Sequence, residues 1–173
     1  MGRTLFYASL IVFAALFRFL PHPPNVAPIA AIALFGAAYF ERRFAFILPL
    51  GALFLSDLLL GFYDGMAWVY GSFILVGLVG FWLRSHKGLL PTAGAAIAGS
   101  IVFYVITNFG VWISGSLYPR TLVGLVECYV AALPFFRNTL LGDTAYVALL
   151  FGVTELASRR VSFLKAPTRE TVR

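Results

Sequence analysis

The chain has 173 residues, of which 61% are hydrophobic and 12% are charged, with a mean hydropathy of +0.90. Soluble domains are about half apolar and a quarter charged, so this composition excludes an ordinary soluble protein and predicts one integral membrane bundle. The net charge of +6 is spread between apolar runs, which excludes a nucleic-acid-binding patch, and the one cysteine, Cys128, excludes a disulfide framework or multi-cysteine metal site.

Apolar runs divide the chain into helical segments. We predict an all-α protein with six transmembrane helices, at residues 4–20, 27–40, 44–62, 66–83, 90–113 and 138–157. The apolar stretch 122–133 is too short to cross a bilayer alone and is predicted to be a half-helix before the last span. Residues 1–158 then form a single transmembrane domain, and residues 159–173 form a basic cytoplasmic tail.

Prolines and small residues mark the boundaries of these segments. The cluster Pro21-His22-Pro23-Pro24-Asn25 predicts a rigid, extended loop after the first helix. The second helix, 27–40, is rich in alanine and glycine, which lets helix backbones approach closely in lipid. Pro134 is expected to end the half-helix, because the residue before a proline avoids helical backbone angles.

The distribution of basic residues predicts the orientation of the chain. With six spans and an inner N-terminus, three basic residues fall outside, namely Arg18, Arg120 and Arg137. The other ten fall inside, namely Arg3, Arg42, Arg43, Arg84, Lys87, Arg159, Arg160, Lys165, Arg169 and Arg173. Because cytoplasmic loops carry an excess of Lys and Arg, both termini are predicted to be cytoplasmic.

Three polar residues lie near the outer ends of different predicted helices. Asp57 is on the third helix, Asn108 on the fifth and Asp143 on the last. Ionisable residues at membrane depth are costly and usually face a protein interior or a cavity. Their common level predicts a pocket that opens to the outer side and binds a small molecule.

Further residues are candidates for this pocket. Tyr104, Asn108 and Trp112 recur every fourth residue, so they share one helix face and form an amide flanked by aromatic rings. The predicted substrate-binding residues are Asp57, Asn108, Trp112, Asn138, Asp143, Tyr104, His22 and Asn25.

Each of the buried polar residues also has a purely structural interpretation. Asp143 either contacts the ligand or pairs with Arg137, and Asp57 either contacts it or neutralises Arg18 or Arg137. Asn108 alternatively joins helices by hydrogen bonds.

Motifs for catalysis are missing from the sequence. It contains no phosphate-binding glycine loop with its lysine, no GxSxG and no HExxH. His22 has no second histidine or cysteine at metal-ligand spacing. We therefore expect no enzymatic activity, no cofactor and no bound metal.

Four segments together resemble an uncharacterised family of bacterial membrane proteins, recorded as a domain of unknown function. These segments are 18–38, 55–62, 107–112 and 134–143. That family is distantly similar to the S components of energy-coupling factor transporters. Asp57 followed by Gly61, and the pair Gly142-Asp143 after a proline entry, look like the S-component pattern.

This resemblance implies a function and partners. S components are six-helix proteins of the bacterial inner membrane that bind vitamins or metal ions from outside, with or without a coupling subunit and two ATPases. It therefore implies uptake of a vitamin-like solute. The alanine-rich docking row of the S-component first helix falls here on the second helix. The alternative function is a structural or assembly subunit without transport.

Overall fold

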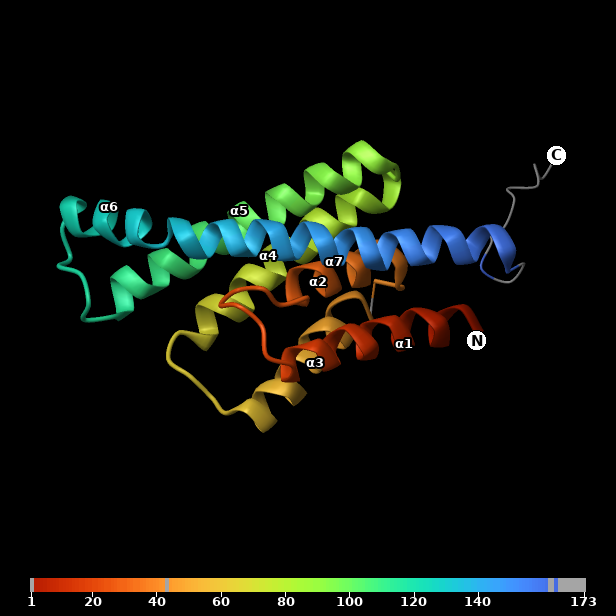
Figure 1. The fold of residues 1–173 in the computed structure, drawn as a ribbon, viewed down its shortest axis with the longest axis horizontal. Coiled ribbons are helices and arrows are strands. Elements are labelled where there is room, and N and C mark those ends of the chain that lie inside the picture. Colours follow the sequence, from red (N-terminus) through yellow and green to blue (C-terminus); the bar gives the residue numbers. More distant parts are fainter. Residues whose placement is uncertain (1, 43, 162–163, 165–173) are drawn as a thin grey trace.

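The computed structural model describes residues 2–42, 44–161 and 164. Over these residues it is all-helical and contains no strand. The helices are α1 (Gly2–Leu16), followed by the 3-10 turn η1 (Phe17–Phe19), α2 (Ile29–Tyr39), α3 (Phe44–Leu60), α4 (Met66–Ser85), α5 (Leu89–Ser114), α6 (Leu122–Ala131) and α7 (Leu133–Arg160). They form an elongated bundle in which α1 begins and α7 ends at the same end of the molecule (Figure 1).

Four segments of the described chain are long and apolar enough to cross a membrane. They are Gly2–Phe19, Met66–Ser85, Leu89–Ser114 and Leu133–Arg160. These segments indicate a membrane protein. At about 1.5 Å per residue, α2 and α3 rise about 17 and 26 Å and fall short of a hydrocarbon core of about 30 Å. The expected count of six spans is therefore not confirmed, because two of the predicted helices are too short.

Helix α2 forms the centre of the bundle. Every residue from Ile29 to Ala38 is buried, and the helix contacts α1, α3, α4, α5 and α7. Such burial on all sides explains why the helix has no polar face. Its alanines and Gly36 allow close neighbours, and a Cβ on Gly80 of α4 would meet the backbone of Leu34. The small residues of α2 thus serve packing within this chain.

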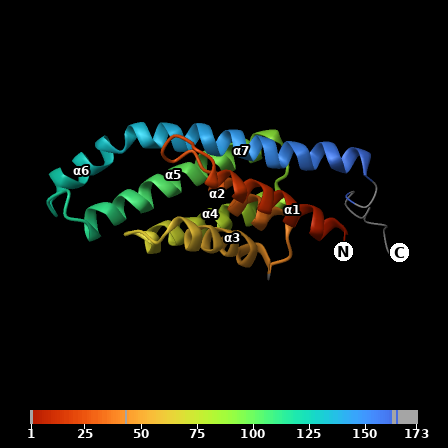
Figure 2. The same ribbon diagram turned by 60° about the horizontal axis from the view of Figure 1, so that its bottom comes forward.

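Helices α5, α6 and α7 extend beyond the other helices. Helix α6 lies at the end of the molecule farthest from the N-terminus and runs on into α7 (Figures 1 and 2). It begins at its N-cap, Thr121, whose hydroxyl accepts a hydrogen bond from the Gly124 amide at 3.2 Å. The predicted half-helix is therefore present, as ten residues.

The start of the last helix differs from the prediction. Helix α7 begins at Leu133, before Pro134, and not at Asn138. A proline in the first helical turn lacks only an amide that would be unpaired there anyway. Pro134 therefore lies in the first turn of α7 and does not separate it from α6 by a loop.

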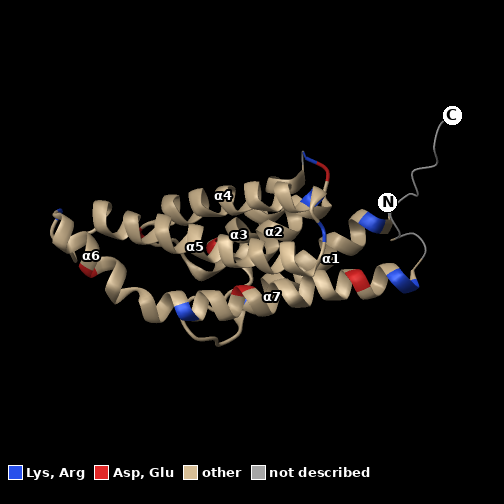
Figure 3. Cartoon of the chain, turned by 90° about the horizontal axis from the view of Figure 1, so that it is seen from above, with Lys and Arg blue, Asp and Glu red and all other residues tan. Residues whose placement is uncertain are grey.

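Basic residues gather at one end of the bundle. Figure 3 shows the Lys and Arg segments concentrated where α1 begins and α7 ends. Within the described residues, this end carries Arg3, Arg42, Arg84, Lys87 and Arg159, among others.

Candidate functional site

A cavity of about 430 Å³ opens between the C-terminal ends of α1 and α3 and the starts of α2 and α4. We call it the distal pocket, because it lies at the ends of α1 and α3 that are remote from the N-terminus. Its lining residues come from η1, the loop 20–28 and helices α2, α3, α4, α5 and α7. They are Arg18, His22, Asn25, Ala27, Ile29, Ala30, Leu53, Leu60, Tyr63, Val69, Phe73, Phe103, Thr139 and Asp143.

Each oxygen of the Asp57 carboxylate contacts one protein group. Its Oδ1 lies 2.8 Å from Nη2 of Arg18, and its Oδ2 accepts a hydrogen bond from the Tyr70 hydroxyl at 2.8 Å. Arg18 also donates to the Ser56 hydroxyl and, at 3.3 Å, to the Leu53 carbonyl. Asp57 is completely buried, so it acts here as the counter-ion that holds Arg18 at the pocket wall. The predicted pairing of Asp57 with Arg18 is confirmed.

Asp143 reaches the same pocket from α7 and has a different environment. Its Oδ2 accepts a hydrogen bond from the Ser100 hydroxyl at 2.7 Å. The predicted alternative, an ion pair with Arg137, is absent among the described residues. In that part of the chain no donor meets Oδ1 of Asp143, although the residue is only 3% exposed. Asp143 thus differs from Asp57 in that, within the described residues, a hydrogen-bond donor meets only one of its two carboxylate oxygens.

The proline-rich loop after η1 covers one side of the pocket. Asn138 of α7 donates from Nδ2 to the Pro24 carbonyl at 3.1 Å, which fixes the loop to the bundle. Asn25 adopts φ 64°, a left-handed conformation that asparagine tolerates better than most residues. His22 and Asn25 both line the cavity, whereas Asn138 positions the loop that carries them.

Apolar side chains form the opposite wall. The rings of Phe73 on α4 and Phe103 on α5 stack with centroids 5.3 Å apart and an interplanar angle of 24°. Val69 lies one helical turn before Phe73 and also lines the pocket. The pocket therefore combines an apolar wall with a polar wall made by Arg18, Asp143 and the loop.

The predicted stripe on α5 faces α6 and does not line the distal pocket. The Tyr104 hydroxyl donates to the Tyr129 carbonyl at 2.6 Å, and Nε1 of Trp112 donates to the Pro119 carbonyl at 3.0 Å. Asn108 donates to the Tyr104 carbonyl of its own helix, and its carbonyl accepts from Sγ of Cys128 at 3.4 Å. The side chains of Tyr104 and Trp112 and the backbone carbonyl of Asn108 thus link α5 to α6 and to the loop before α6.

Sequence reasoning did not predict several pocket residues. Thr139 precedes Asp143 by four residues on α7, so helical spacing already placed the two on one face. Arg18 was predicted only as a charge partner for Asp57. Phe73 and Phe103 carry no signal that separates them from the other phenylalanines in the sequence.

The pocket offers both apolar surface and hydrogen-bonding groups. Its volume and mixed lining suit a small molecule held by apolar contact at one side and by hydrogen bonds at the other. Among the described residues, no group of three or more His, Cys, Asp or Glu side chains is arranged to hold a metal ion.

The comparison with protein families gives one match. The model described as a family of unknown function (DUF6580) matches residues 1–167, so the chain belongs to this family. No curated protein and no solved structure matches the chain.

Proposed function

We propose that this member of the DUF6580 family binds a small solute in the distal pocket and takes part in its uptake across a bacterial inner membrane. The observation that carries the proposal is the Asp143 carboxylate, which lines a cavity of about 430 Å³ with one oxygen unpaired among the described residues. A buried carboxylate without a full set of donors is costly unless a ligand or water supplies them.

The pocket lining indicates the kind of solute. The free oxygen of Asp143 favours a ligand with an amine or another N–H donor, since a carboxylate is a strong acceptor. The stacked pair Phe73 and Phe103 favours an aromatic or aliphatic body at the other end. Arg18 is already neutralised by Asp57, so the pocket offers little attraction to an anionic solute.

The proposed orientation places the distal pocket on the outer side. Basic residues gather at the opposite end of the bundle, and cytoplasmic segments carry an excess of Lys and Arg. This arrangement and the resemblance to S components support a substrate-binding subunit or a solitary transporter. Any coupling subunit with its ATPases docks on a surface other than α2, whose small residues are buried within the chain.

The test is solute retention by the purified protein. Native mass spectrometry of wild-type protein, purified from cells in mild detergent, is expected to detect one bound small molecule. Asp143→Asn keeps an acceptor for Ser100 but removes the charge, and we expect at least about a tenfold loss of the bound solute. Glu127→Gln is the matched control, because Glu127 is exposed on α6 and lies outside the pocket.

The alternative, a structural subunit without transport, predicts a different result. The Arg18–Asp57 ion pair and the Ser100–Asp143 hydrogen bond also stabilise the packing of neighbouring segments of the bundle. In that case the wild-type protein carries no solute, and Asp143→Asn changes only its melting temperature. That pair of results would contradict the proposed function.

A further inference from the structure

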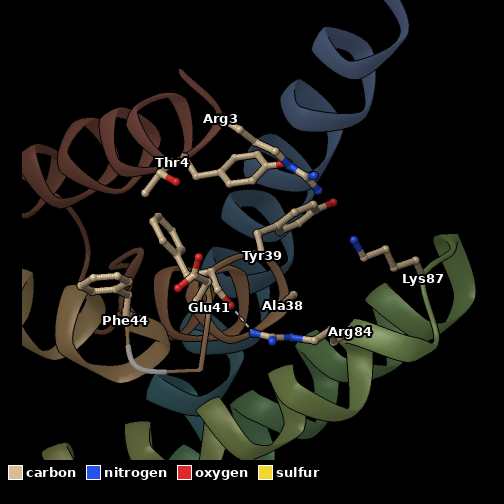
Figure 4. A pocket seen from close by; sticks show the side chains of 10 residues that line it. Arg3, Thr4, Ala38, Tyr39, Glu41, Phe44, Arg84 and Lys87 are labelled. Carbon is tan, nitrogen blue, oxygen red and sulfur yellow. Dashed lines mark hydrogen bonds between the residues drawn. The ribbon is translucent and has the colours of Figure 1, made fainter. Parts of the chain in front are cut away.

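A second cavity lies at the basic end of the bundle and is separate from the distal pocket. This proximal pocket has a volume of about 480 Å³ and lies where α1 and α3 begin and α2 and α4 end. Its lining residues are Arg3, Thr4, Tyr7, Ala38, Tyr39, Phe40, Glu41, Phe44, Arg84 and Lys87. Figure 4 shows Arg3, Tyr39, Arg84 and Lys87 placed around the cavity.

Three cations reach the proximal pocket from three parts of the chain. Arg84 donates from Nε and Nη2 to the Ala37 carbonyl, at 3.1 and 2.7 Å, and from Nη2 to the Phe40 carbonyl, so it caps the end of α2. Arg3 donates from Nε to the Tyr7 hydroxyl at 3.1 Å. The Lys87 ammonium lies 4.4 Å from the centre of the Tyr39 ring. None of the three forms an ion pair within the described residues.

The charges at this pocket are unbalanced. Glu41 is the one carboxylate in the lining, and nearby Glu155 is paired with Arg159 at 3.1 Å. The pKa of Lys87 is lowered, first by partial desolvation and then by Arg3 and Arg84, while Glu155 acts in the opposite direction. Lys87 lies in the loop between α4 and α5, so its positive charge is located at the end of the bundle.

A separate apolar groove lies along the seam of α1 and α3 and begins within one helical turn of the pocket-lining residues of both helices. This α1–α3 groove has a volume of about 380 Å³ and is lined mainly by aliphatic side chains. On α1 the row Thr4, Ala8, Ile11 and Ala15 passes from pocket to groove at helical spacing. On α3 the row 44, 48, 51 and 55 does the same.

We propose that the proximal pocket and the α1–α3 groove together bind one anionic phospholipid. Arg3, Arg84 and Lys87 hold its phosphate, and the groove holds an acyl chain. Arginine forks match phosphate oxygens, and basic pockets between membrane helices suit anionic headgroups. The rows on α1 and α3 each extend over about 17 Å, which exceeds the roughly 15 Å of one leaflet, so an acyl chain fits along them. A free phosphate would use the pocket alone and would leave the groove unexplained.

The experiment counts lipids that stay bound to the protein. Protein is equilibrated in micelles containing equal amounts of phosphatidylglycerol and phosphatidylcholine, and native mass spectrometry measures the lipids retained. Each Lys or Arg near an anionic headgroup contributes about fivefold to binding, so Arg3→Gln/Lys87→Gln is expected to retain phosphatidylglycerol about 25-fold more weakly. Arg84 is left intact because it caps α2. Lys87→Arg, with Arg3 unchanged, keeps the positive charge and is expected to retain the lipid as the wild-type protein does.

Two further variants separate a lipid from a free anion. A Cβ on Gly51 of α3 would have nothing within 4 Å, so Gly51→Phe adds a ring to the lining of the groove from a position without close neighbours. It is expected to reduce phosphatidylglycerol retention at least about tenfold. Arg120→Gln/Arg137→Gln, which removes two exposed charges outside the pocket, is the control and is expected to retain the lipid.

Three results would overturn the proposal. The first is a wild-type protein with no preference for phosphatidylglycerol over phosphatidylcholine. The second is equal loss of lipid in the pocket variant and in the Arg120/Arg137 control. The third is unchanged retention in Gly51→Phe together with displacement of the lipid by inorganic pyrophosphate, which would assign the pocket to a free phosphate. Unchanged melting temperatures show that each variant is folded.

Discussion

At the scale of single residues, the two buried aspartates differ in what the protein supplies to them. Asp57 receives Arg18 and Tyr70, one group for each oxygen, whereas Asp143 receives only Ser100. The sequence could predict that both face the interior, because a carboxylate in an apolar run avoids lipid. It could not predict their partners, since Tyr70 and Ser100 lie on helices whose rotation depends on the packing of the whole bundle.

We expect Asp57→Ala to destabilise the fold strongly. The substitution leaves the guanidinium of Arg18 at a mostly buried position without its counter-ion, which typically costs about 3 kcal/mol or more. For a protein of this size, that corresponds to a fall of roughly 10 °C in melting temperature. Intrinsic fluorescence during thermal unfolding in detergent measures it.

A double variant shows whether charge is the cause. Arg18→Leu/Asp57→Leu removes both charges and should recover most of the lost stability, because an apolar pair can replace a buried ion pair. Asp64→Ala, in the exposed loop between α3 and α4, should have little effect. If the double variant melts as low as Asp57→Ala, the unpaired charge of Arg18 is not the cause of the lost stability.

At the scale of helices, sequence patterns predicted where most helices lie in the chain but not which neighbouring helix each face contacts. The predicted ranges 66–83 and 90–113 agree with α4 and α5 to within two residues at each end. Pro134 was misinterpreted as the end of a helix, because first-turn prolines and helix-ending prolines look alike in sequence. The stripe Tyr104, Asn108 and Trp112 does share one face of α5, but periodicity gives a face and not the neighbour that this face meets.

The crossing of α2 and α4 provides a test at this scale. A Cβ on Gly80 would lie 2.7 Å from the Ala37 Cβ and 2.7 Å from the Leu34 carbonyl oxygen. A backbone atom cannot move aside without shifting α2, so Gly80→Ala is expected to lose about 1–3 kcal/mol of stability.

Gly71 is the matched control on the same helix. A Cβ there has nothing within 4 Å, so Gly71→Ala should gain up to about 1 kcal/mol from better helix propensity. Both variants are compared by thermal unfolding in the same detergent. Equal melting temperatures for the two alanine variants would contradict the close contact between α2 and α4.

At the scale of the whole molecule, the bundle has two chemically different ends. The distal pocket has its positive charge neutralised and keeps one carboxylate oxygen free, whereas the proximal pocket has an excess of positive charge. The distribution of Lys and Arg along the sequence predicted which basic residues lie at the same end of the bundle, because every second loop between spanning helices lies on the same side. The pockets themselves depend on side-chain packing between four or five helices, which no local pattern in the sequence encodes.

This asymmetry predicts the orientation of the protein in a membrane. Single cysteines are introduced in a Cys128→Ala background, at exposed Ser85, the last residue of α4, and at exposed Ser116 between α5 and α6. Because basic segments stay inside, a membrane-impermeant maleimide added to intact cells should label Ser116→Cys and not Ser85→Cys. Both sites should react after the membrane is permeabilised, which controls for accessibility. Labelling of Ser85→Cys in intact cells would show the opposite topology. The distal pocket would then open to the inside, and uptake from outside could not begin there.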